Sequence, residues 1–265
     1  MRYAFLLAAL ACACAHAPQR VDVSEPTVVV AHQRDDDVDA AFRAARAEYD
    51  LGRREAAAAR LRAIAERPDA SAAQRASARV QEAVCRIELG DRAEGERLLR
   101  ATLEIPEAEP SVAAQAEFWL GGLYGGDFRS VRLDPAAMDD AALSAAVERK
   151  AELLLSAQGH YLRAIRRGDP EWATAAGSRI GELYETFHDD LVAAPLPPGL
   201  SASQRSTYVD ELHRKVRVLV EKAIGIYEET LDLASRTGAR TEYRERTEAA
   251  LRRLRALLLG APAGG

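Results

Sequence analysis

One short segment, His188-Asp189-Asp190, groups a histidine with two carboxylates, which is a combination found among metal ligands. A metal site needs further ligands at defined spacing, and no second histidine follows at such a spacing. We therefore interpret the segment as a solvated part of a helix and expect no metal. Two more histidines, His160 and His213, stand alone, and His160 beside Tyr161 is interpreted as a helix-surface residue rather than a general base.

Other candidate chemistry is equally sparse. The acidic run Arg34–Asp39 lacks the glycine and the distal glutamate of a calcium loop, so we assign it to the negative charge favoured at a helix N-terminus. Three cysteines, Cys12, Cys14 and Cys85, can form neither a disulfide framework nor a four-ligand zinc site. Because Cys85 falls on an apolar helix face, we expect it to be a small buried residue. No phosphate-binding loop, nucleophile elbow or pair of catalytic carboxylates is present, so the sequence predicts a protein that is no enzyme and has no cofactor.

Composition predicts which elements hold these residues. The chain has 265 residues, of which 48% are hydrophobic and only 6% aromatic. Alanine, leucine, arginine and glutamate dominate it, and all four favour helix, so we predict an all-α protein. The net charge of −5, with both signs interspersed, gives no basic face for nucleic acid.

Residues 1–17, MRYAFLLAALACACAHA, have the pattern of an export signal. One interpretation is a lipoprotein signal that is cut before Cys12, which then carries the lipid, because 9–11 form a loose lipobox. The other is ordinary cleavage after Ala13, Ala15 or Ala17. We favour the lipoprotein, because a cysteine at the end of so short an apolar run is otherwise hard to explain.

On this interpretation the protein is exported and anchored at a membrane without crossing it. Ala13 follows the lipidated Cys12, and in a Gram-negative cell the absence of aspartate there favours the outer membrane, with the protein facing the periplasm. We predict a flexible tether over residues 18–35, because they hold no helical period, and a folded domain over 36–259.

The folded part contains an internal repeat. Gly52 with Pro68 recurs thirty-eight residues later as Gly90 with Pro106. Two helical hairpins are predicted around these positions, with the glycines in the turns and with Asp36, Ser71 and Asp91 as N-caps. Their helices are 36–51 with 53–67, and 71–89 with 91–104.

Small residues recur at fixed spacing in these hairpins. Ala45 is followed twelve residues on by Ala57, and Ala83 by Gly95. Small side chains allow two antiparallel helices to approach closely. Large or branched residues then follow four and seven positions later on the second helix, and they are Leu61 with Ile64 and Leu99 with Thr102.

Two further copies follow with aromatic residues at the same offsets. Their first helices carry Gly121 with Tyr124 and Gly181 with Tyr184; their second helices carry Ala157, Tyr161 and Ala164, and Ala223, Tyr227 and Thr230. This pattern resembles the tetratricopeptide repeat (TPR), and the resemblance covers about residues 36–258. It implies a TPR-like α-solenoid of four hairpins, closed by a capping helix over 240–259.

The third and fourth copies contain extra residues between the two helices. In the fourth, the helical period predicts long helices over 171–191 and about 203–234, separated by the Pro-rich segment 195–201. In the third, 125–135 is predicted to be an irregular loop before a long helix that ends at Arg167. We expect these long hairpins to pack side by side as a paddle.

Residues 149–238 also resemble part of the repeat-containing envelope lipoproteins of myxobacteria and their relatives, one of which belongs to the gliding-motility apparatus. This resemblance implies a role in an envelope assembly. We therefore expect a non-catalytic scaffold or adaptor for envelope proteins, with Trp119 and Trp172 in packing roles. Two alternatives remain open, which are a periplasmic protein that binds peptides or peptidoglycan fragments and an accessory subunit of an envelope enzyme complex.

Overall fold

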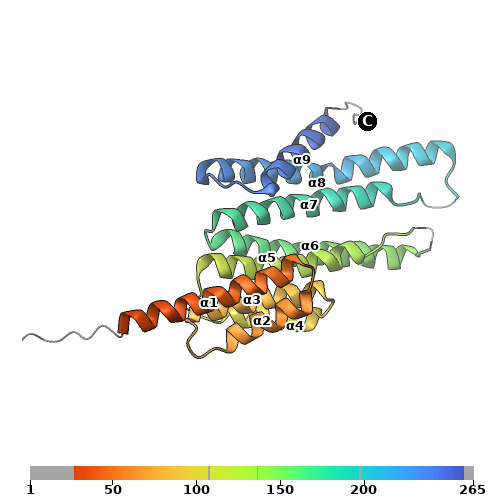
Figure 1. The fold of residues 1–265 in the computed structure, drawn as a ribbon. Coiled ribbons are helices and arrows are strands. Elements are labelled where there is room, and N and C mark those ends of the chain that lie inside the picture. Colours follow the sequence, from red (N-terminus) through yellow and green to blue (C-terminus); the bar gives the residue numbers. More distant parts are fainter. Residues whose placement is uncertain (1–26, 107, 136, 197–198, 260–265) are drawn as a thin grey trace, which may run out of the picture.

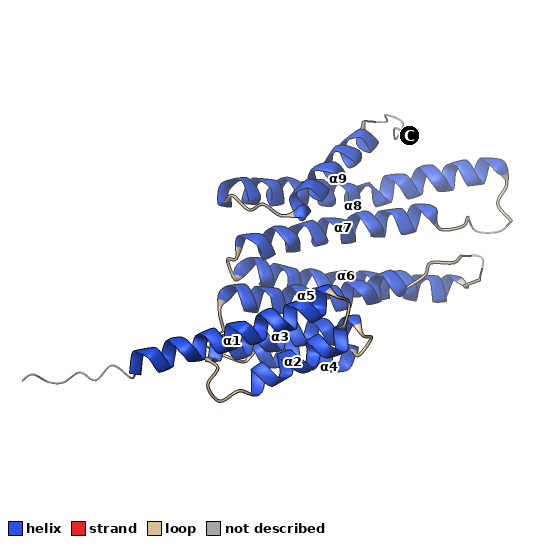
Figure 2. Cartoon of the chain, viewed as in Figure 1, coloured by secondary structure: helices blue, strands red, loops and turns tan. Residues whose placement is uncertain are grey.

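The structure is a computed structural model that describes residues 27–106, 108–135, 137–196 and 199–259. All regular secondary structure in these ranges is helical, so the predicted all-α class is confirmed (Figure 2). The helices are α1 (Thr27–Asp50), α2 (Arg54–Glu66), α3 (Ala72–Glu88), α4 (Arg92–Leu103), α5 (Pro110–Ser130), α6 (Asp140–Arg166), α7 (Pro170–Ala193), α8 (Ala202–Thr237) and α9 (Glu242–Leu258).

Helices adjacent in the sequence pack against one another, from α1 and α2 through to α8 and α9 (Figure 1). Contacts also join α3 to α5, α5 to α7 and α7 to α9, so most odd-numbered helices form a second connected row. An arrangement of helices packed sequentially in adjacent pairs is compatible with a helical repeat.

Helix boundaries in the first two pairs follow the predicted signals. Gly52 and Gly90 adopt left-handed φ angles of 78° and 87° in the two turns, a conformation that glycine reaches without a steric penalty. Ser71 forms a capping box with Gln74, and the Asp91 side chain accepts a hydrogen bond from the Glu94 amide. These signals were therefore interpreted correctly.

The first helix begins earlier than predicted. Since α1 starts at Thr27, Asp36 lies within the helix and is no N-cap, and residues 27–35 of the predicted tether are helical. The acidic run 34–39 is likewise internal to α1, so the assignment to a helix N-terminus was wrong. Residues 27–35 have no apolar period, so the sequence pattern did not predict that the amphipathic helix after residue 37 extends back through them.

Close helix approach is achieved by glycine against tyrosine in the two long pairs. A Cβ placed on Gly121 would lie 2.8 Å from the Tyr161 ring, and one placed on Gly181 would lie 2.1 Å from the Tyr227 ring. Both rings are at most 2% exposed. In the shorter pairs the matching positions are alanine against leucine, and all four side chains are buried, namely Ala45, Leu61, Ala83 and Leu99.

The two long pairs also repeat a second set of contacts. Tyr124 stacks on His160 of α6, with ring centroids 5.3 Å apart, and its hydroxyl lies 3.3 Å from Arg100 of α4. Tyr184 likewise bonds Gln158 of α6 and lies beneath Lys222 of α8. Each tyrosine thus lies between the preceding even-numbered helix and its own partner helix.

The long pairs extend beyond the short ones on one side of the molecule (Figure 1). Helix α8 has 36 residues and α6 has 27, whereas α2 and α4 have 13 and 12. The predicted loop over 125–135 is wrong in its first half, because α5 continues to Ser130. Phe128 is fully buried and packs edge-on against Phe187, so tertiary contact sustains the helix through Gly125 and Gly126.

Lys150 joins the three helices at the base of this extension. Its side chain on α6 is fully buried, and its ammonium donates hydrogen bonds to the carbonyls of Phe128 (2.7 Å) and Val131 (3.0 Å) at the end of α5. It also forms an ion pair of 2.8 Å with Asp190 of α7. A buried charge is tolerated only when it is paired and hydrogen-bonded, and Lys150 meets both conditions.

Gly181→Ala should destabilise the protein by about 2 kcal/mol, because the new methyl group would overlap the Tyr227 ring in a packed interior. Chemical denaturation followed by circular dichroism measures the effect. Gly225→Ala on α8 is the matched control, since its Cβ would meet nothing within 4 Å. It should be neutral or stabilising by up to about 1 kcal/mol, and an equal loss in both variants would contradict the packing role.

Candidate functional site

The histidine interpreted as a surface residue is buried. His160 is 8% exposed, and its Nδ1 lies 2.8 Å from Glu117 of α5. Glu117, only 3% exposed, also accepts a hydrogen bond from Arg163 at 3.1 Å. Burial alone would raise the pKa of Glu117, but the hydrogen bonds from His160 and Arg163 outweigh it and hold the pKa below 4.5. The cluster therefore ties α5 to α6.

The segment 188–190 lies within α7, as predicted, but its histidine is largely buried while Asp189 is exposed. The His188 side chain is 13% exposed and its Nδ1 lies 2.9 Å from Asp189. It lines a small cleft with His213, so that histidine does not stand alone in space. Among the described residues, no group of three or more histidine, cysteine or acidic side chains could hold a metal ion.

Three clefts follow one another along the odd-numbered helices. The first, of about 740 Å³, lies between α1, α3 and α5 and reaches Trp172; the second, of about 370 Å³, lies beside it and is bounded by Trp172 and Trp119. The third, of about 600 Å³, also contains Trp119. Because neighbouring clefts share a tryptophan, we describe the three together as the groove.

The half of the groove nearest α1 has polar walls, with two arginines and two carboxylates (Arg43, Arg46, Asp39 and Glu109) beside uncharged side chains. Gln81 and Gln115 each line two of its clefts, and Gln81 donates to Ser77. Cys85 contributes to the floor, is 1% exposed as expected, and has its pKa raised to about 11 by burial. Carboxamide side chains both donate and accept hydrogen bonds, which matches the donors and acceptors of a peptide backbone.

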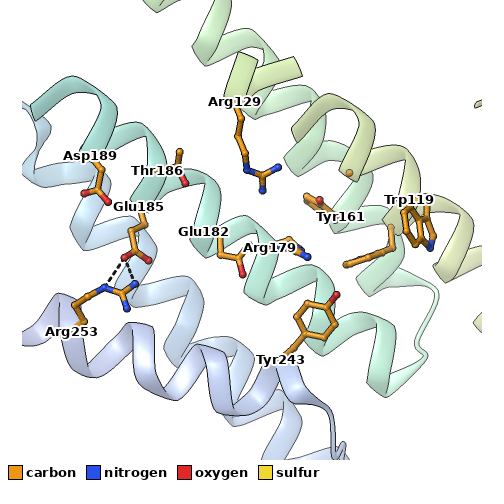
Figure 3. Close-up of a pocket in the computed structure, with 12 residues that line it drawn as sticks. Trp119, Arg129, Tyr161, Arg179, Glu182, Glu185, Thr186, Asp189, Tyr243 and Arg253 are labelled. Carbon is orange, nitrogen blue, oxygen red and sulfur yellow. Dashed lines mark hydrogen bonds and ion pairs between the residues drawn. The ribbon is translucent and has the colours of Figure 1, made fainter. Parts of the chain in front are cut away.

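The third cleft, between α5, α7 and α9, is the most charged part of the groove (Figure 3). Two of its arginines are paired, since Arg179 lies 2.6 Å from Glu182 and Arg253 bonds Glu185. An aromatic wall adjoins them, in which Phe118 contacts four other rings, those of Trp119, Tyr161, Trp172 and Tyr243. The tryptophans therefore pack, as expected, and they also line the groove.

Three polar groups of this cleft have no hydrogen-bond or ion-pair partner among the described residues, and one of them is the buried indole Nε1 of Trp119. Tyr161 is 2% exposed, and no described residue forms a hydrogen bond with its hydroxyl. Arg129 extends from α5 towards the space beside Tyr161 (Figure 3), and no described carboxylate forms an ion pair with it. Burial raises the pKa of Tyr161 to about 12 against the opposing effect of Arg179 and Arg129, so the hydroxyl keeps its proton.

Of the repeat positions identified from the sequence in the third and fourth copies, Tyr161 is the one that lines this groove. Tyr161 forms part of its floor, while the buried Ala157, Ala223 and Tyr227 pack between helices. Sequence reasoning missed Arg129, Arg179 and Glu117 altogether. Arg129 follows Gly121 by eight residues, which places both on one face of a continuous helix. Because residues 125–135 were predicted to be a loop, the position of Arg129 on this face was not recognised.

Comparisons of the chain with protein-family models, with curated proteins and with solved structures find no match. Cys12, the predicted lipidation site, lies outside the described residues, as do the rest of the export signal and the tether up to residue 26. None of the helices that the structure describes is long and apolar enough to cross a membrane.

Glu117→Gln should make the free energy of unfolding depend less steeply on pH in the acid range. Because the pKa of Glu117 is lower in the folded state, its charged form stabilises the fold above about pH 4.5, and this contribution is lost as the pH falls through the folded pKa. Urea denaturation between about pH 3 and pH 6 measures the slope. Glu152→Gln, at an exposed carboxylate, is the control and should keep the wild-type slope; equal slopes in wild type and Glu117→Gln would contradict the prediction.

Proposed function

We propose that this protein is a non-catalytic scaffold that binds a segment of a partner protein in the groove along its odd-numbered helices. The observation that carries the proposal is the succession of three clefts along these helices, in which neighbouring clefts share the side chain of Trp172 or Trp119. A chain segment lying there would meet the partly exposed rings of Trp119 and Trp172, carboxamides and ion pairs. Rigid aromatic side chains and arginines are the residues that concentrate binding energy at protein interfaces.

The finer fold assignment belongs to the same proposal. We assign the helix pairs to a TPR-like solenoid, supported by the recurrence of Gly against Tyr at Gly121 and Gly181 and by the matching environments of Tyr124 and Tyr184. Stacked helix pairs create long surfaces that recognise extended or helical segments without catalysing a reaction.

We further propose that the protein works in a bacterial envelope, as an outer-membrane lipoprotein anchored through Cys12 and facing the periplasm. Support comes from the N-terminal sequence and from the resemblance of residues 149–238 to envelope lipoproteins. On this proposal the partners are other envelope proteins. The protein belongs with them to a motility complex or to another envelope-spanning assembly, which is the role that the resemblance implies.

Gln115→Arg should abolish partner binding, because Gln115 is half-buried in two clefts and a longer charged side chain would fill the groove. Affinity purification from detergent-solubilised envelopes of the native host, followed by mass spectrometry, should recover a stoichiometric protein with the wild type only. Ala145→Arg, at an exposed site on α6 outside the groove, is the matched control and should retain it. Recovery of the wild type as a free monomer would contradict the scaffold.

Cys12→Ser should release the protein from membranes, because it removes the only thiol that the lipoprotein interpretation assigns to acylation. Fractionation of cells into soluble and membrane pools measures the shift, and Cys14→Ser serves as the control that should stay membrane-bound. Unchanged membrane partition of Cys12→Ser would contradict the anchor and leave ordinary signal cleavage as the alternative.

A further inference from the structure

A cleft outside the groove combines aliphatic and basic side chains. It has a volume of about 370 Å³ and lies between α7, α8 and the C-terminal end of α9, a helix that crosses α8 at an angle (Figure 1). Four aliphatic side chains, Leu257 among them, line it together with two histidines, Arg214 and Arg217. No carboxylate lines this cleft, whereas three line the cleft between α5, α7 and α9. The cleft therefore favours a ligand that is apolar in one part and anionic in another.

Leucines at the end of α9 continue the aliphatic wall of this cleft into solvent. Leu257 is 48% exposed, and Leu259, the residue that follows the helix, is 84% exposed. Earlier in the same helix, Leu251 and Leu254 are buried in the core beneath α9. Isolated exposed leucines are common on protein surfaces, but neighbouring ones beside an apolar cleft form a patch of the kind that marks an interaction surface.

The charge around this apolar patch is positive. Residues 212–220 of α8 and 249–259 at the end of α9 contain six basic residues and no acidic one. The six are Arg214, Lys215, Arg217, Arg252, Arg253 and Arg255. Lys215 and Arg252 are exposed and form no ion pair with a described residue. Basic side chains clustered beside exposed leucines attract an anionic surface.

The two arginines of the cleft are accessible to such a surface. Arg214 pairs with Glu211 and Arg217 with Glu221, which lie three and four residues away on the same helix. The four side chains are between 48% and 70% exposed. Because exposed ion pairs contribute little to stability, these guanidinium groups can exchange their carboxylates for another anion at little cost.

We propose that the C-terminal end of α9 and the adjacent part of α8 dock on the surface of an anionic lipid bilayer. Leu257 and Leu259 enter the boundary between head groups and acyl chains, and Arg214 and Arg217 bind lipid phosphate. Leucines and basic residues combined on one helical surface are the chemistry that binds membrane interfaces. The inference goes beyond the proposed partner binding, because this surface lies outside the groove.

The shape of the surface favours a bilayer over a single bound amphiphile. Leu259 projects from the end of α9 and is not among the residues that line the cleft, so one ligand in the cleft would leave it in water. A bilayer covers the cleft and the projecting leucine together. Stable membrane attachment takes two signals, so this contact adds to the proposed anchor at Cys12 and does not replace it.

Fluorescence of an introduced indole tests the contact at one residue. Leu259→Trp places the indole at the proposed contact, and Leu51→Trp, at a 65% exposed leucine after α1, is the matched control. Both variants are made in the full chain with Cys12→Ser, which also gives the signal of the two native tryptophans for subtraction. Vesicles with brominated acyl chains quench an indole that enters them, and they contain phosphatidylcholine either alone or mixed with phosphatidylglycerol.

The anionic vesicles should quench the indole introduced at 259 saturably and leave the one at 51 unchanged. Arg214→Gln and Arg217→Gln, each combined with Leu259→Trp, should weaken this binding about fivefold, the factor expected for one basic residue at an anionic surface. Arg236→Gln is the control on the same helix, because it is 69% exposed and has the same kind of ion pair, with Asp232 four residues away. It should leave the binding unchanged, and circular dichroism verifies that each variant is folded.

No quenching at 259, or equal quenching at 51 and 259, would overturn the docking surface. Equal quenching by neutral and anionic vesicles would overturn the role of the arginines and with it the choice of an anionic surface. If soluble dihexanoyl phosphatidylglycerol shifts the emission of the indole at 259 at the same lipid concentration as the vesicles do, the cleft binds a single lipid and the bilayer proposal falls. None of these outcomes changes partner capture by the groove, which is tested separately at Gln115.

Discussion

The close approach of paired helices is the constraint on which the rest of the structure depends. In each long pair an aromatic ring of the second helix occupies space that only a glycine on the first helix leaves free, as Gly121 does for Tyr161 and Gly181 for Tyr227. This contact sets the distance between partners in a pair. It also fixes the positions of the two tyrosine hydroxyls. Tyr161 lines the groove, and the Tyr227 hydroxyl donates a hydrogen bond to Glu185.

The same contacts give the odd-numbered and even-numbered helices different roles. Most groove residues come from α1, α3, α5, α7 and α9. The even-numbered helices contribute only a few side chains, such as Leu61 and Tyr161, at the floor of the clefts. Glu185 illustrates the coupling, because it accepts hydrogen bonds from Tyr227 of α8 and Arg253 of α9. A wall of the groove is thereby held in part by α8, which contributes none of the residues that line the three clefts.

Periodic features were predictable from the sequence, and features that depend on tertiary contact were not. Glycine turns, capping residues and the buried small positions follow from local rules, so the end of α1, the helices α2 to α4 and the boundaries of α6 to α9 could be placed within a few residues. The start of α1 could not, since it lies nine residues before the predicted one. The continuation of α5 through Gly125 and Gly126 could not, because it depends on Phe128 meeting Phe187 and on Lys150 bonding the last carbonyls. His160 was misjudged for the same reason, since Glu117 lies 43 residues away in the chain. The groove itself emerges only when helices distant in sequence lie side by side.

The most direct measurement of the central claim is site-specific photo-crosslinking in intact envelopes of the native host. A photoreactive amino acid in place of Gln115 lies within the groove, whereas one in place of Leu155, a 62% exposed position on α6, lies outside it. The groove position should yield a single discrete adduct with another envelope protein, and the α6 position none. Adducts from Leu155 alone, or no adduct from Gln115, would contradict a partner-binding groove.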